Sequence, residues 1–225
     1  MLEKTSEEGR ARSPLSRRAL LDCALTIIDR DGLESLSMRR LAAEFDVSAM
    51  SLYNHVPNKE ALLEGVTETL LGEIDLSAAD SNDWTEAIKE GFRSFRRVLL
   101  AHPNALPLIQ TKRAPSPEAF RPIEVSLATL RRGGFDEEGA LKAHWLLVGY
   151  TLGHVGFMLS NPMLLSDDGP PTDLPRDAGI AAEEFHHLFE CLPFAVACDP
   201  DEVYEFGLET IVEGLRRRVG EDPST

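Results

Sequence analysis

The stretch SMRRLAAEFDVSAMSLYNHVPNK, residues 37–59, decides how the N-terminal part of this 225-residue chain folds. Apolar residues recur at helical spacing from Met38 to Phe45, and Ser37 precedes them as an N-cap whose hydroxyl can accept a backbone N–H. Asp46-Val47 then marks a tight turn. Residues 49–55 make about two further turns of helix, at roughly 3.6 residues per turn. The stretch therefore predicts two short helices joined by a turn.

The outward side of the second helix carries no carboxylate. Leu52 and Val56 face the same way as Leu41 and Phe45, so they would bury one side of this helix. The remaining positions hold small or hydrogen-bonding side chains, whereas a surface helix in an acidic protein would be expected to carry Glu or Asp there. Two short helices, a tight turn and an acid-free second helix are typical of a helix-turn-helix that enters the major groove.

The longer run LSMRRLAAEFDVSAMSLYNHVPNKEALLEGV, residues 36–66, resembles the N-terminal DNA-binding domain of the TetR family of bacterial regulators. The most specific part is V-S-x-x-S-L-Y-x-H-φ-x-N-K-E-A-L-L over residues 47–63, where φ is apolar. The resemblance implies an all-α homodimer that binds double-stranded operator DNA and a small-molecule effector. The DNA-binding residues that it implies are Ser37, Arg39, Ser48, Ala49, Met50, Ser51, Tyr53, Asn54, His55 and Lys59.

Within that set the chemistry suggests different roles. We expect Ser37, Tyr53 and Lys59 to contact phosphates, which set the register of the protein on DNA. Arg39 suits either a phosphate or a guanine. An asparagine such as Asn54 can pair bidentately with adenine, and the apolar Ala49 and Met50 suit thymine methyl groups.

The distribution of charge is compatible with DNA binding although the net charge is −15. Residues 1–59 hold nine Lys or Arg and nine Asp or Glu, whereas residues 60–225 hold 14 and 29. A phosphate-facing surface needs only local positive charge. Four arginines over residues 10–18 either belong to an ordinary solvated tail or form an arm that touches the DNA backbone or minor groove.

The rest of the chain reads as helical, without strand alternation or internal repeats. We predict a disordered arm at residues 1–15, a three-helix helix-turn-helix DNA-binding domain at 16–60 and a helical ligand-binding and dimerisation domain at 61–225. The longest helix, 136–160, is apolar nearly all round, which indicates burial on both sides in a core or subunit interface. Residues 161–175 read as a mobile loop. The predicted helices are 16–30, 58–74, 84–101, 116–132, 136–160, 180–191 and 200–219.

The second half resembles the regulatory domain of the tetracycline repressors at residues 109–115, Gly134-Phe135 and 149–153. The candidate ligand-binding residues are Phe95, Leu99, Leu108, Thr111, Arg113, Leu127, Trp145, His154 and Phe157. Thr111 matches a ligand-site threonine of those repressors. Leu108, however, replaces a metal-binding histidine, and Phe157 aligns with a glutamate that holds the water shell of the metal. We therefore expect no tetracycline–magnesium binding, no metal and no cofactor, but a more apolar effector.

Other classes of protein have little support. The polar N-terminus and the lack of a long apolar run argue against a signal peptide or a membrane span. Three cysteines without a C-x-x-C motif fit the cytoplasm. His186, His187 and Cys191 could share a helical face, but no further metal ligands lie near them. An enzyme would need a catalytic motif, and none is evident. The main alternative is a ligand-binding or scaffold protein with a vestigial helix-turn-helix. Repression is the family default, and activation stays open.

Overall fold

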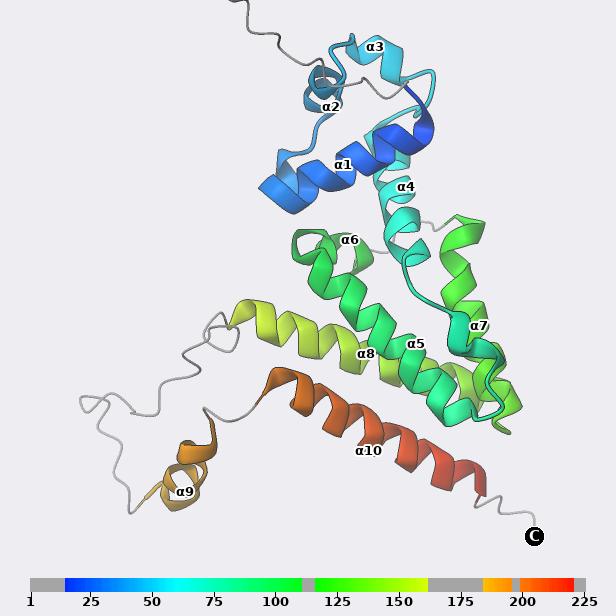
Figure 1. Ribbon diagram of the computed structural model, residues 1–225, viewed down its shortest axis with the longest axis vertical. Helices are drawn as coiled ribbons and strands as arrows, with labels where there is room; N and C mark the ends of the chain where they lie inside the picture. Colours follow the sequence, from blue (N-terminus) through cyan, green and yellow to red (C-terminus); the bar gives the residue numbers. More distant parts are fainter. Residues whose placement is uncertain (1–14, 111–115, 162–183, 196–198, 221–225) are drawn as a thin grey trace, which may run out of the picture. The chain divides into compact units, whose positions relative to one another are not determined.

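The computed structural model describes residues 15–110, 116–161, 184–195 and 199–220. Over these ranges the regular elements are helical and there is no strand, which confirms the predicted all-α class (Figure 1). The α-helices are α1 (Arg17–Asp31), α2 (Met38–Glu44), α3 (Ala49–Leu52), α4 (Lys59–Gly72), α5 (Trp84–Ala101), α6 (Leu106–Gln110), α7 (Arg121–Arg132), α8 (Glu137–Ser160), α9 (His186–Ala195) and α10 (Pro200–Gly220). Short 3₁₀ helices are η1 (Leu33–Ser35), η2 (Ser77–Asp80), η3 (Pro103–Ala105) and η4 (Pro117–Phe120).

The chain divides into two compact units. Unit 1 comprises Met1–Glu73 and His102–Ala119, and unit 2 comprises Ile74–Ala101 and Phe120–Thr225. The whole of α4, together with η3 and α6, thus belongs with the helix-turn-helix part of the chain. The functional division proposed at residue 60 stays a prediction.

Unit 1 is built on α1, which packs against α2, α4 and η3. Its apolar stripe is fully buried at Leu20, Ala24 and Ile28, because the spacing of these residues places them on one side of the helix. The helix ends at Gly32, whose φ of 85° is a backbone conformation that glycine adopts without strain. Ser37 caps α2 as predicted by accepting the N–H of Arg40, and Asn58 caps α4 by accepting the N–H of Ala61.

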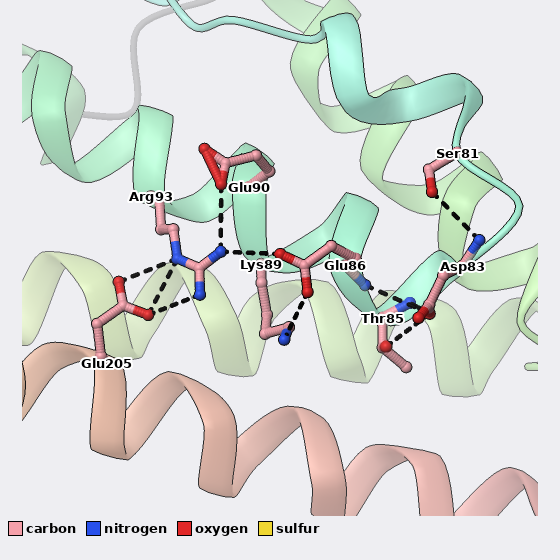
Figure 2. Close-up of polar contacts among 8 residues, drawn as sticks. All are labelled: Ser81, Asp83, Thr85, Glu86, Lys89, Glu90, Arg93 and Glu205. Carbon is pink, nitrogen blue, oxygen red and sulfur yellow. Dashed lines mark hydrogen bonds and ion pairs between the residues drawn. The ribbon is translucent and has the colours of Figure 1, made fainter.

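Unit 2 packs α5 against α7, α8 and α10. The start of α5 at Trp84 follows from Asp83, whose Oδ1 accepts the backbone N–H of Thr85 at 2.9 Å and its hydroxyl at 2.6 Å (Figure 2). These hydrogen bonds from Thr85 lower the pKa of the Asp83 carboxyl. α5 then runs over the predicted range 84–101 without interruption.

The long helix α8 buries only one side within unit 2, where Leu147, Thr151 and Val155 are almost inaccessible. α10 lies beside it and runs in the opposite direction (Figure 1). Both helices also carry large apolar side chains that are exposed, among them Phe157 of α8 at 62% and Phe206 of α10 at 74%. The all-round apolar character of residues 136–160 therefore corresponds to one buried and one exposed apolar face in the single chain.

Several predicted bounds differ from the structure. α3 ends at Leu52 and the chain continues in turns to His55, because Tyr53 and His55 bond back to Met50 and Leu52 with shorter, three-residue spacing. Residues 180–183 of the helix predicted over 180–191 lie outside the described residues, and α9 runs from His186 to Ala195, past an internal Pro193. Residues 117–120 form a 3₁₀ helix before α7. The predicted arm up to residue 14, and residues 162–175 of the predicted loop, lie outside the described residues.

Candidate DNA-binding face and effector site

The turn between α2 and α3 sets the orientation of the second helix. Asp46 at this turn has a φ of 55°, a left-handed conformation that aspartate tolerates better than most side chains. Leu41 and Leu52 are completely buried, and Val56 is nearly so. The buried side of α3 is thus packed against the rest of unit 1, and its other side is exposed.

The exposed side of α3 carries the predicted base-reading residues. Met50 is 75% exposed, although a methionine normally gains by burial, and Tyr53 and Asn54 are exposed as well. Ala49 and His55 are half-buried at the edges of this face. The predicted residues of α3 and of the turns that follow it are therefore accessible to a partner, and we call this surface the reader face. It is defined by the exposed Ser48, Met50, Tyr53 and Asn54 and the half-buried Ala49, Ser51 and His55.

Two of these residues hold each other in place. The hydroxyls of Ser48 and Ser51 lie 3.1 Å apart, where either can donate to the other. Ser48 precedes α3 but makes no side-chain capping bond to its backbone. Its hydroxyl is exposed and remains able to donate or accept a further bond.

The basic residues of unit 1 differ in whether they already have a partner. Arg17 pairs with Glu68, Arg30 and Arg40 pair with Asp31, and Arg18 pairs with Asp22 at 3.8 Å. Within the described part of unit 1, the basic side chains that make no ion pair are Arg39 and Lys59. Both are exposed. These cations are thus available for phosphates without first breaking an internal ion pair.

A second feature lies in unit 2, where aromatic side chains form a continuous run from α5 to α8. The ring centroids are 6.4 Å apart for Phe95 and Phe92, 6.2 Å for Phe92 and His144, and 5.6 Å for His144 and Trp145. His144 is buried, and its Nδ1 lies 3.0 Å from the hydroxyl of Ser126 on α7. Burial lowers the pKa of His144, so the ring is neutral at pH 7.

The predicted ligand-binding residues do not all gather at this run. Phe95 and Leu99 are buried on α5, half-buried Leu127 lies on α7, and Trp145 is exposed on α8. The ring of His154 lies instead 5.2 Å from that of Tyr204 on α10, tilted by 54°, and Phe157 is exposed. Leu108 belongs to the core of unit 1, and Thr111 and Arg113 lie outside the described residues.

Several polar residues of unit 2 were not predicted from the sequence. They include His144, Ser126 and the buried pair of Arg96 and Tyr204, whose guanidinium and ring centroid lie 4.8 Å apart. The sequence of α8 could have indicated two of them, because His144 and Thr151 are seven residues apart on the same buried side as Leu147. A polar residue on the buried side of an apolar helix needs a partner, and that partner is found here on α7 or α10.

The interface of α5 with α10 is held by two arginines. Arg93 donates from Nε and Nη2 to Glu205 at 2.8–3.0 Å, and its Nη1 reaches Glu86 and Glu90 (Figure 2). One turn further on, Arg96 Nη2 pairs with Asp201 at 2.6 Å. Tyr204 is fully buried between these helices; its hydroxyl donates to the carbonyl of Phe92 and lies 3.0 Å from Thr151 Oγ1. Burial raises the pKa of Tyr204 to about 12.

The histidines of α9 contact a carboxylate on the same helix. His186 and His187 both contact Glu190, at 3.3 and 3.1 Å, and Cys191 is exposed. Over the described ranges no group of three or more His, Cys, Asp or Glu side chains is arranged to hold a metal ion. In the same ranges no helix is both long and apolar enough to cross a membrane.

Comparison with known families accounts for both units. The family described as "Bacterial regulatory proteins, tetR family" matches residues 20–66, and "Tetracyclin repressor-like, C-terminal domain" matches residues 77–219. The chain belongs to the TetR family. The proteins that this TetR-family chain resembles are transcriptional regulators and not enzymes, which confirms the predicted class.

Relatives of this TetR-family regulator match it over different lengths. The class E tetracycline repressor of Escherichia coli is 33% identical over 218 residues, which are 94% of this chain and 95% of the repressor. An HTH-type transcriptional regulator of Saccharopolyspora erythraea is 32% identical over 152 residues, or 68% of this chain. That match spans only 64% of the length of the Saccharopolyspora protein.

Solved structures share the whole fold. Apo ActR from Streptomyces coelicolor superposes with a TM-score of 0.76 at 31% identity, covering 94% of this chain and 99% of ActR. ActR in complex with actinorhodin gives a TM-score of 0.75 at 29% identity, covering 93% and 100%. The predicted helix-turn-helix domain followed by a helical C-terminal domain is thus confirmed.

Proposed function

We propose that this TetR-family regulator is a cytoplasmic repressor that binds a palindromic operator as a homodimer. In this proposal a small, largely apolar effector binds in unit 2 and releases the DNA. The observation that carries the DNA-binding part is the reader face together with Arg39 and Lys59. These two cations are exposed and have no ion pair in the described part of unit 1, although most other basic residues there do.

The exposed apolar face of α8 and α10 supports a homodimer. Trp145 and Phe157 on α8 and Phe206 on α10 are each more than half exposed, which is unusual for side chains of this size. Two copies that pair these helices would form a four-helix bundle and bury this face. A helix-turn-helix dimer reads two half-sites about one helical turn apart, so its operator is a palindrome.

The aromatic run around His144 supports an apolar effector. Phe92, Phe95 and Trp145 offer aromatic faces, and the His144–Ser126 pair supplies one polar anchor in an otherwise apolar environment. Leu108 lies in the packed core of unit 1, 1% exposed, and has no atom that can bind a metal. We therefore expect a metal-free ligand and not a tetracycline–magnesium chelate. Actinorhodin, with which ActR was solved, is the first probe to test.

The DNA-binding part is tested by titrating labelled DNA, selected from a random pool, with wild type, Arg39→Ala and Arg218→Ala. Arg218 is a matched control because it is also exposed, but it lies on α10 in unit 2. Loss of Arg39 should weaken binding about tenfold or more and reduce the salt dependence of log K by about one per subunit. Equal affinity of Arg39→Ala and wild type would contradict the assignment. No binding even at low salt would favour the scaffold alternative.

The dimer is tested by sedimentation of Phe206→Asp against Phe120→Asp. Both phenylalanines are exposed, but Phe120 precedes α7 and is not on α8 or α10. A charge in the apolar interface should dissociate the Phe206→Asp dimer, whereas Phe120→Asp should sediment as wild type. A monomeric wild type would overturn this part of the proposal.

The effector site is tested by the ability of actinorhodin to release DNA from wild type and from His144→Leu. Leucine keeps much of the volume but removes the bond to Ser126, so half-release should need about tenfold more ligand. Thr26→Ala, at an exposed position on α1 in unit 1, serves as the control. If actinorhodin and a panel of apolar aromatic compounds neither release DNA nor raise Tm, the site is wrong.

A further inference from the structure

His102 lies directly after α5 and brings three parts of unit 1 together. Its Nδ1 is 2.8 Å from Asp29 Oδ2, near the end of α1, and its Nε2 is 3.1 Å from Glu73 Oε2, the residue that caps α4. The side chain is only 16% exposed. The neighbouring Asn104 adds a third link, because its side-chain amide donates to the carbonyl of Asp29 at 2.8 Å.

The geometry around the ring selects one protonation state. A neutral imidazole has one N–H and one lone pair, whereas ionised carboxylates can only accept. With a carboxylate at each nitrogen, the neutral ring can donate to one and must turn its lone pair toward the other. The imidazolium donates to both, so the observed arrangement of His102 between Asp29 and Glu73 fits the charged form.

Asp29 depends strongly on this contact. Its other oxygen, Oδ1, is buried and makes no hydrogen bond in the described part of the chain. Arg30 and Asp31, the other charged residues at the end of α1, pair with each other, and Asp31 also pairs with Arg40 of α2. The charged groups that act on His102 are thus Asp29 from α1 and Glu73 from α4.

The pKa of His102 agrees with the geometry. Partial burial lowers this pKa, but the hydrogen bonds and charges of Asp29 and Glu73 outweigh burial, so that it lies above the ordinary histidine value. The ring therefore keeps its proton to a higher pH than an ordinary histidine does.

The helices that His102 joins carry the reader face. α1 packs on α2, and α4 starts shortly after α3. A fixed angle between α1 and α4 therefore restricts the positions of α2 and α3. Glu73 caps the end of α4, and the imidazole of His102 links it to Asp29 of α1. Protonation of that ring would keep the reader domain ordered before DNA binds, which lowers the ordering cost of binding.

We propose that His102 is a positioning residue that, when protonated, clamps α4 to α1 and thereby strengthens operator binding, which makes operator affinity dependent on pH. This inference rests on the proposed DNA-binding function. As pH rises through the raised pKa of His102, the ring loses its proton, one of the two carboxylates loses its donor, and the ends of α1 and α4 separate more easily.

The first measurement uses the full-length protein without DNA. The His102 ring is titrated by NMR in wild type, in Glu73→Gln and in Glu64→Gln, a matched change of a carboxylate elsewhere on α4 that makes no ion pair in the described chain. His102 should titrate above about 6.5, the ordinary histidine value. Glu73→Gln should move this titration downward and Glu64→Gln should not. A wild-type titration at or below the ordinary value would overturn the clamp.

The second measurement is operator affinity at about pH 6 and about pH 9 for wild type and His102→Gln. Glutamine cannot gain a proton, while the half-buried His55 of the reader face is present in both proteins and cancels in the comparison. Wild type should lose affinity over this interval about fivefold more than His102→Gln does. An equal loss in both proteins would sink the inference but leave the proposed function intact. A protein that binds no DNA at either pH would overturn both, whatever the ring titration shows.

Discussion

Both units are held by a side chain that bridges carboxylates, but the two bridges differ in chemistry. In unit 1, His102 joins Asp29 and Glu73, and in unit 2, Arg93 joins Glu205 of α10 to carboxylates of α5 (Figure 2). The guanidinium keeps its charge over the whole range in which proteins are folded, and the carboxylates around Arg93 raise its pKa further. The imidazole does not keep its charge. The charged bridge in unit 2 is therefore independent of pH, whereas the bridge in unit 1 depends on pH.

Apolar packing should contribute more to the free energy of unfolding than the bridge at Arg93 or the bridge at His102. Leu208 of α10 is fully buried in unit 2, so Leu208→Ala should destabilise the protein by about 2–5 kcal/mol at any pH, through lost burial and the cavity that remains. Urea unfolding measures this change. Glu209→Ala, an exposed neighbour on the same helix, should change stability by less than about 0.5 kcal/mol. If the two substitutions have equal effects, α10 is not packed in solution as described.

The next largest effect is expected at Tyr204. Its hydroxyl donates to the carbonyl of Phe92 and lies beside Thr151, and all of this is buried. Tyr204→Phe keeps the ring under the guanidinium of Arg96 but leaves the Phe92 carbonyl without its donor, which should cost about 1–3 kcal/mol. The double variant with Thr151→Val should recover part of this loss, and a strictly additive pair in urea unfolding would count against the network.

The contributions of Arg93 and His102 to stability should differ in their dependence on pH. Arg93 and its partners are partly exposed, so Arg93→Gln should cost only about 1 kcal/mol, and equally at about pH 6 and pH 9. The folded-state pKa of His102 is raised, so its stabilisation is fully present below the unfolded value and is lost as pH rises through the folded value. His102→Gln should thus lower Tm by about 2–4 °C at about pH 6 and have almost no effect at about pH 9.

The smallest effect is expected for an exposed ion pair that bridges nothing. Glu138 and Lys142 are neighbours on α8, with both side chains more than 70% exposed. Glu138→Gln should change the free energy of unfolding by less than about 0.5 kcal/mol, because water already solvates both charges. A loss as large as that of Arg93→Gln would mean that bridging between helices adds nothing to a surface ion pair.

The sequence predicted the elements whose signals are local. Ser37 forms the cap that was expected of it, and α5 covers its predicted range. α3 was predicted too long, because propensity alone does not distinguish an α-helix from the tight turns at Tyr53 and His55. The end of α9 was predicted four residues too early, because Pro193 lies inside this helix.

Contacts between residues far apart in sequence could not be predicted in the same way. His102 reaches Asp29 and Glu73 across 73 and 29 positions, and Arg93 reaches Glu205 across 112. Each residue taken alone reads as an ordinary surface charge. The reader face was predictable because its residues lie in one short stretch, 48–55, whereas the aromatic run around His144 needs α5, α7 and α8 to be packed first.

The most direct test of operator recognition is selection of DNA from a random pool by the purified wild-type protein at low salt. Binding by the reader face of a homodimer predicts an enriched palindrome with half-sites about 10 base pairs apart, centre to centre. The same pool should yield no enrichment with Tyr53→Ala and Arg39→Ala combined. A wild-type protein that enriches no sequence, or a single unrepeated site that survives both substitutions, would contradict recognition through this face.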